Sequence, residues 1–212
     1  MKVQLLLILV LLTNLKLLGS SRLGSSIRTV AVQGSLLGLL PLFVELDSLN
    51  WRVMTLAIGT VFLKGFVFAN LLFRAINVAN VNREVQPFAG YVSSLLYGIV
   101  ALIVSFWLGQ ILNLGQLSYS PLIIPVSFFG IFSGLFLIVS RRRAISQVLG
   151  FLVLENGVFT FGAGIIKMTS LLVEIGILLD VFVAILVMGI TVFRISQECD
   201  HIDTDKLITL KD

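Results

Sequence analysis

Residues 146–167, SQVLGFLVLENGVFTFGAGIIK, decide the fold class of this chain. The stretch is mostly apolar and 22 residues long, and a helix needs about 20 residues to cross the hydrocarbon layer of a membrane. One carboxylate, Glu155, lies near its centre. These residues therefore predict a membrane-spanning helix that carries an ionisable group at mid-depth.

The composition of the whole chain points the same way. Of its 212 residues, 58% are hydrophobic and 12% are charged, whereas about a quarter of the residues in a soluble domain are charged. This balance excludes a water-soluble globular fold. It predicts an all-α integral membrane protein that crosses the cell (inner) membrane several times.

We expect about seven transmembrane helices, each close to the length needed to span the membrane. They are predicted at residues 3–18, 27–46, 51–72, 91–112, 122–139, 146–167 and 171–193. The spans group into an N-terminal membrane region (1–121), a three-helix membrane region (122–193) and a C-terminal tail (194–212).

The first span has two interpretations. Lys2, the apolar run that follows it and the small residues 19–21 have the outline of a secretory signal peptide. However, the apolar run continues through Leu17 and Leu18, and another span follows in place of a polar domain. We therefore expect the first span to be retained, with cleavage as the alternative.

Lysine and arginine residues are distributed unequally between the two ends of the predicted spans. One end carries eleven of them and the other carries Lys2, Arg52 and Lys167. The eleven are Lys16, Arg22, Arg28, Arg74, Arg83, Arg141, Arg142, Arg143, Arg194, Lys206 and Lys211. Because cytoplasmic loops retain positive charge, the N-terminus is expected outside and the C-terminus in the cytoplasm. Basic residues spread in this way are topology signals and do not predict a nucleic-acid partner.

Few residues could bind a metal or a redox cofactor. The chain has one cysteine, Cys199, and one histidine, His201, and both lie in the polar tail. An intramolecular disulfide is impossible with a single cysteine, and an iron–sulfur cluster or a structural zinc site needs more thiolates than this. The chemistry available within the membrane is that of carboxylates, lysines and water.

Four ionisable groups fall within the predicted spans: Lys64, Glu155, Glu174 and Asp180. Glu155 and Asp180 are expected near the membrane midplane, Lys64 about two-thirds of the way through its span, and Glu174 at a shallower depth. A charge at the bilayer centre costs at least about 2.5–3.5 kcal/mol, so such groups are usually functional.

Two interpretations of these charges remain open. They can form a chain of protonatable sites that relays protons across the membrane, or they can pair merely to hold helices together. Gln33, near the middle of the second span, is open to the same choice between extending a proton path and forming an interhelical hydrogen bond.

Three segments carry a resemblance to a known family. They are GFLVLENG (150–157), LVEIGI (172–177) leading to Asp180, and LITLK (207–211). Together they resemble the membrane component E of hydrogenase-4 and of related formate hydrogenlyase complexes, most strongly over residues 140–212. The last three spans are in turn similar to the small three-helix subunit of respiratory complex I and to its relative in multisubunit cation/proton antiporters.

The resemblance implies roles for particular residues. In the small complex I subunit two intramembrane glutamates help to form a proton path, and Asp180 stands at the position of the second. The position of the first is occupied by Leu152, and Glu155 follows about one helical turn further on. Lys64 is similar to a lysine in the third span of the component E family.

The function that the resemblance implies is that of a non-catalytic subunit of an energy-converting, complex I-like hydrogenase, translocating protons or sodium ions. Its implied partners are antiporter-like subunits, a quinone-chamber-type anchor subunit, a cytoplasmic nickel–iron hydrogenase with iron–sulfur subunits, and membrane lipids. The nickel–iron centre and the clusters would lie in those partners, with no cofactor in this chain. The alternatives are a subunit of a cation/proton antiporter without a redox arm, and a purely structural scaffold.

Overall fold

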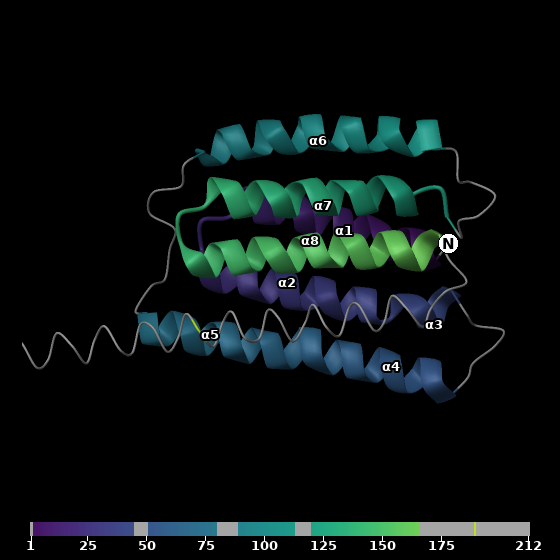
Figure 1. The fold of residues 1–212 in the computed structure, drawn as a ribbon, viewed down its shortest axis with the longest axis horizontal. Helices are drawn as coiled ribbons and strands as arrows, with labels where there is room; N and C mark the ends of the chain where they lie inside the picture. The colour runs from purple at the N-terminus through teal and green to yellow at the C-terminus, as the bar shows by residue number, and fades with distance from the viewer. Residues whose placement is uncertain (1, 45–50, 80–88, 113–119, 166–188, 190–212) are drawn as a thin grey trace, which may run out of the picture.

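The computed structural model describes residues 2–44, 51–79, 89–112, 120–165 and 189, and the regular elements in this part of the chain are helices. The helices lie side by side as a bundle (Figure 1). They are α1 (Lys2–Leu18), α2 (Leu23–Gly38), α3 (Leu40–Val44), α4 (Trp51–Phe62), the π-helix η2 (Leu63–Val67), α5 (Phe68–Ala79), α6 (Tyr91–Leu112), α7 (Ile123–Ser140) and α8 (Ala144–Ile165).

Within the described residues, five helical stretches are long and apolar enough to cross a membrane. They are Leu23–Phe43, Ala57–Asn77, Tyr91–Leu112, Ile123–Ser140 and Ala144–Ala163. The prediction of an all-α protein with several apolar spans is confirmed to this extent. The first predicted span forms α1, which has 17 residues and is shorter than the roughly 20 residues of a typical membrane span. The seventh, at 171–193, lies outside the described residues except for residue 189.

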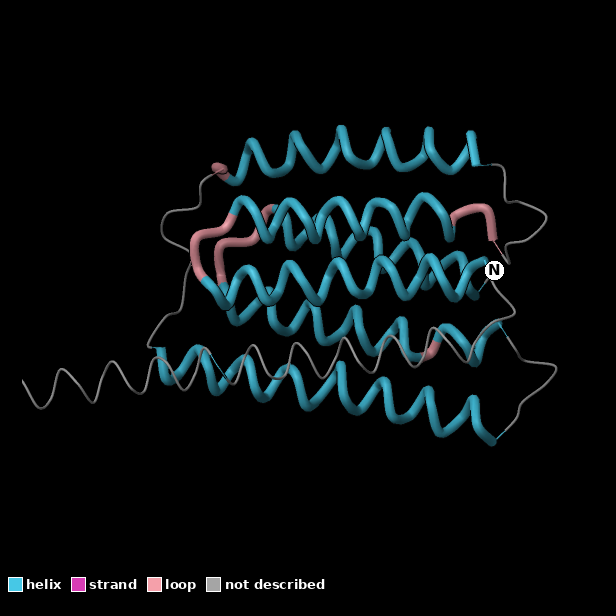
Figure 2. Tube along the Cα trace, in the orientation of Figure 1, coloured by secondary structure: helices cyan, strands magenta, loops and turns pink. Residues whose placement is uncertain are grey.

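The connections place two basic turns at the same end of the bundle. The turn between α1 and α2, which includes Arg22, lies at the same end as the turn between α7 and α8, which includes residues 141–143 (Figures 1 and 2). Two of the basic segments that the sequence assigned to one side thus lie together in the described part of the chain. Which end faces the cytoplasm stays a prediction.

A proline at the start of α3 accounts for the break between α2 and α3. Pro41 has no backbone N–H with which to bond the carbonyl of Leu37, and its ring crowds that carbonyl. The chain therefore leaves the α-helical path at Leu39, whose N–H bonds to the carbonyls of Ser35 and Leu36. Apolar α3 then continues in nearly the same direction, so the two helices form one span (Figure 2).

The closest helix pair in the bundle is α7 and α8, and glycines explain why. A Cβ on Gly134 would lie 2.4 Å from the backbone nitrogen of Leu154, and one on Gly157 would lie 2.6 Å from that of Ile131. Small residues spaced along facing helices allow backbones to approach closely in membranes. These contacts fix the position of residues 154–157 along the axis of α7.

The apolar core joins α7 and α8 to the N-terminal helices. Leu18, Ile27, Phe129 and Val153, from α1, α2, α7 and α8, are almost fully buried and belong to one cluster. By contrast, α6 lies at one edge of the bundle (Figure 1) and exposes large apolar side chains such as Trp107. An exposed apolar face of this kind suits contact with lipid acyl chains.

Candidate functional site: a buried ion pair at mid-bundle

Lys64 lies in a break of the α-helical pattern. The chain is helical from Trp51 to Ala79, but the turn from Leu63 to Val67 is a π-helix with one extra residue. Such π-turns are rare and often occur at functional sites, because the extra residue redirects side chains that a regular helix would point elsewhere. Here the π-turn includes Lys64, which is 7% exposed.

Two glycines bring this turn against α2. A Cβ on Gly34 would lie 2.7 Å from the Cβ of Lys64, and a Cβ on Gly65 would lie 2.3 Å from the Oγ of Ser35. The missing side chains therefore let the π-turn pack directly on α2. This packing holds the stem of Lys64 between helices rather than beside lipid.

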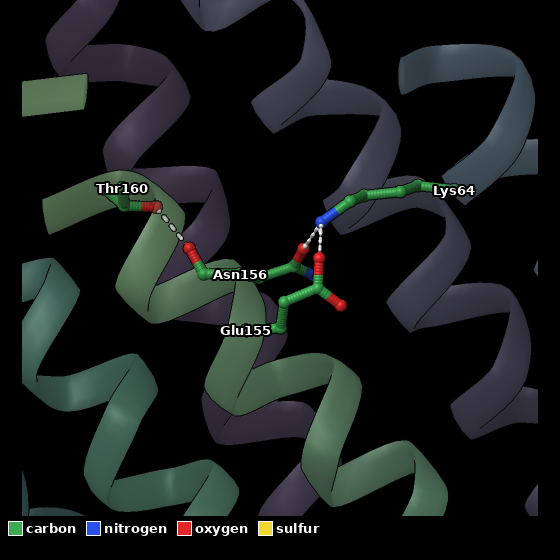
Figure 3. Close-up of polar contacts among 4 residues, drawn as sticks. All are labelled: Lys64, Glu155, Asn156 and Thr160. Carbon is green, nitrogen blue, oxygen red and sulfur yellow. Dashed lines mark hydrogen bonds and ion pairs between the residues drawn. The ribbon is translucent and has the colours of Figure 1, made fainter. Parts of the chain in front are cut away.

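From this position Lys64 reaches across to α8, as Figure 3 shows. Its Nζ donates to Oε1 of Glu155 in an ion pair and lies 3.3 Å from Oδ1 of Asn156. It also lies 5.6 Å from the centroid of the Phe159 ring, close enough for a cation–π contact. Three side chains of α8 thus surround one ammonium group.

Both charges are removed from solvent and lipid. The side chains of Lys64 and Glu155 are 6% and 3% exposed, and Glu155 lies at the middle of α8. Burying a charge is tolerated when an opposite charge and hydrogen bonds compensate for the lost solvation. Thr160 Oγ1 bonds to the carbonyl of Asn156 at 2.7 Å, which gives the neighbouring turn a further internal hydrogen bond (Figure 3).

A second buried polar pair lies beside the first. Nε2 of Gln33 donates to Oδ1 of Asn14 at 2.8 Å, which links α2 to α1. The interhelical hydrogen bond predicted as one alternative for Gln33 is confirmed. In the described part of the chain, Nδ2 of Asn14 and Oε1 of Gln33 have no hydrogen-bond partner. The amide NH2 of Asn14 and the carbonyl oxygen of Gln33 are therefore available for further hydrogen bonds.

Packing contacts connect the two polar pairs. Gly34, which follows Gln33 in α2, packs on Lys64. On the other flank, a Cβ on Gly130 would lie 3.5 Å from Nδ2 of Asn14 and 3.1 Å from the Cα of Gly157, next to Asn156. The amide pair and the ion pair are thus neighbours in the interior of the bundle.

The structure brings together two of the four predicted site residues. Lys64 and Glu155 are in direct contact, whereas Glu174 and Asp180 lie outside the described residues. Sequence reasoning missed two members of the polar interior, Asn156 and Asn14. The available signals were an amide next to the intramembrane glutamate and an amide within the apolar run of the first span.

Arg141 differs from the expectation for a basic loop. The sequence counts it among the basic residues of the cytoplasmic loops, and in the structure it is 3% exposed. Its Nη2 donates to the carbonyl of Leu18 at 3.0 Å, and its guanidinium lies 5.0 Å from the centroid of the Tyr91 ring. Arg141 therefore ties the α7–α8 turn to the last residue of α1 and to the start of α6.

The described residues contain no group of three or more histidine, cysteine, aspartate or glutamate side chains that could hold a metal ion. Glu155 is the only acidic residue in this part of the chain. The chemistry that the described site can perform is thus proton and charge exchange between a carboxyl group, an amine and amides. That the chain holds no cofactor stays a prediction.

Fold and site together define a helical protein with several membrane-length helices and an ion pair buried between two of them. The sequence is 31% identical over 192 residues to the uncharacterized protein Rv0085 of Mycobacterium tuberculosis, a match that covers 88% of this chain and 85% of that protein. The chain belongs to the family of Rv0085. No protein-family model and no solved structure matches the sequence.

Proposed function

We propose that this chain is a non-catalytic, ion-translocating subunit of an energy-converting, complex I-like hydrogenase in the cell membrane. The observation that carries the proposal is the buried contact between Lys64 and Glu155. An ammonium and a carboxylate held together at mid-bundle form a pair whose charge state can be altered by one proton. The sequence resemblance to component E of hydrogenase-4 supplies the class of complex.

The proposed mechanism is electrostatic. A redox event in a partner subunit changes the charge near the bundle, and the Lys64–Glu155 contact opens or closes in response. When the contact opens, Glu155 can take up a proton, because a buried carboxylate without its cation is strongly disfavoured. When it closes, the ammonium expels that proton. The π-turn supports this role, since such interruptions of a regular helix often occur at functional sites.

Polar neighbours give the released proton somewhere to go. Asn156 accepts from Lys64, and in the neighbouring Asn14–Gln33 pair the NH2 group of Asn14 and the carbonyl oxygen of Gln33 have no partner among the described residues. A proton path needs hydrogen-bonding groups in series, and these amides, which pack beside the ion pair, are the candidates for its next members toward α1. In the proposed path Asp180 and Glu174 continue the relay.

Partner identity is the first test. We would purify the tagged full-length chain from native membranes in mild detergent and identify co-purifying proteins by mass spectrometry. We expect antiporter-like subunits, a quinone-chamber-type anchor subunit and a nickel–iron hydrogenase with its iron–sulfur subunits. Antiporter subunits without any hydrogenase would move the assignment to a cation/proton antiporter. A chain that purifies with none of these would contradict the proposal.

A further inference from the structure

A groove of about 660 Å³ lies between α1 and α2, separate from the buried ion pair. Three cationic side chains line it: Lys16 near the end of α1, Arg22 at the N-cap of α2, and Arg28 in α2. All three are exposed. The only carboxylate in the described part of the chain, Glu155, is paired with Lys64, so the groove is strongly positive.

Neighbouring groups in the groove are also suited to an anion. Ser25 supplies a hydroxyl group to its lining, whereas the hydroxyl of Thr13 donates to the carbonyl of Val10 at 2.7 Å. Arg28 is held from the other side by Phe73 of α5, whose ring centroid lies 5.9 Å from the guanidinium carbon. A guanidinium fixed in this way presents its remaining donors as a planar fork, the arrangement that matches phosphate oxygens.

The shape of the groove favours an amphiphile over a free ion. It extends along α2 from Arg22 to Val32, which is about 15 Å at the usual helical rise of about 1.5 Å per residue. Its cationic side chains extend from Arg22 to Arg28 and form the mouth of the groove, and Val32, an apolar residue that is 54% exposed, lies about one helical turn beyond Arg28 and forms its apolar wall. Cations followed by an exposed apolar residue match a lipid headgroup and the start of its acyl chain.

We propose that this groove binds an anionic phospholipid, with its phosphate held by Lys16, Arg22 and Arg28 and an acyl chain lying along Val32. Basic pockets between membrane helices are known to recognise anionic headgroups. The site is independent of the ion pair and of the proposed function. It fixes the α1–α2 edge of the bundle to the lipid of one leaflet.

The test is a titration of the purified full-length chain in neutral detergent, followed by native mass spectrometry. The probes are dioleoyl phosphatidylglycerol, dioleoyl phosphatidylcholine and inorganic phosphate. We expect phosphatidylglycerol to bind more tightly than phosphatidylcholine. Each cation near an anionic group contributes about fivefold in affinity. The triple variant Lys16→Gln/Arg22→Gln/Arg28→Gln should therefore lose this preference by about a hundredfold.

A matched control separates a built site from general surface charge. Arg74, Arg142 and Arg143 belong to the same predicted cytoplasmic side as the three groove cations, but they do not line the groove. Changing these three to glutamine removes the same charge and should leave the preference for phosphatidylglycerol within about twofold, because only distant charges are lost. Equal losses in the two triple variants, or none in either, would overturn the proposal.

A second variant keeps the charge and tests the lipid tail. Val32→Trp fills the apolar wall of the groove and should weaken phosphatidylglycerol binding while the cationic mouth is unchanged. This variant also tests the proposal if the triple variant does not fold. Displacement of bound phosphatidylglycerol by millimolar inorganic phosphate, or full binding of this lipid by Val32→Trp, would show that the groove recognises the phosphate alone and would overturn the proposal of a lipid site.

Discussion

The contact between Lys64 and Glu155 predicts a large energetic coupling between two residues that are 91 positions apart in sequence. Removing one member of a buried ion pair costs about 3–5 kcal/mol, because the remaining charge stays buried without compensation. Removing both members avoids that penalty. We therefore expect Lys64→Met to destabilise the chain by about 3 kcal/mol.

Glutamine retains the size of Glu155 and an acceptor for the ammonium, so Glu155→Gln should cost less, about 2 kcal/mol, the range of a hydrogen bond to a charged group. Because the double variant leaves no unpaired charge, it should lose no more stability than Lys64→Met alone, about 3 kcal/mol at most. The coupling between the two sites is then at least about 2 kcal/mol, within the range for residues in contact.

The assay is equilibrium unfolding of the full-length chain in mixed lipid–detergent micelles, followed by the helical circular dichroism signal. Lys16→Met combined with Glu155→Gln is the control, because Lys16 is exposed and lies in the groove between α1 and α2. Its effects should add to within about 0.5 kcal/mol. If Lys64→Met and Glu155→Gln also added to within that margin, the reasoning from the ion pair would be refuted.

Two further predictions concern packing and topology. Gly157→Leu should destabilise the chain by about 1–3 kcal/mol or more, because a Cβ at this position would lie 2.6 Å from the backbone nitrogen of Ile131. The same unfolding assay measures the loss, and wild-type stability would contradict the close approach of α7 and α8. In a Cys199→Ser background, a cysteine introduced at Lys206 should react with an impermeant thiol reagent only in broken cells, and labelling of intact cells would reverse the assigned orientation.

The helices could be predicted closely from the sequence because the signal is strong. Apolar runs of about 20 residues define membrane spans with little dependence on tertiary context. The predicted span 91–112 has the same bounds as α6, and the span 122–139 lies within one residue of α7. Boundaries were less accurate where a proline interrupts the helix or a short polar connection intervenes, as at Pro41 near the start of α3.

The site could be predicted only in part. The deep placement of Lys64 and Glu155 follows from their positions in apolar spans. Their contact, however, depends on the distance between the π-turn and α8. That distance depends on the close packing of the π-turn on α2 at Gly34 and Gly65. The π-turn itself has no reliable sequence signature. The burial of Arg141 also depends on tertiary contacts, since Leu18 and Tyr91 lie far from it in sequence.

The measurement that tests the central claim most directly is ion uptake by membrane vesicles that contain the assembled complex. Wild type, Lys64→Met, Glu155→Gln and the double variant would be compared at equal amounts of complex, with assembly checked in each. If the ion pair belongs to the translocation path, each single variant should lower proton or sodium uptake to about a tenth or less of the wild-type rate. This loss corresponds to a barrier increase of at least about 1.4 kcal/mol. The double variant should lower the uptake little further. Uptake at the wild-type rate by fully assembled Lys64→Met and Glu155→Gln complexes would contradict the account and leave the ion pair as a structural contact.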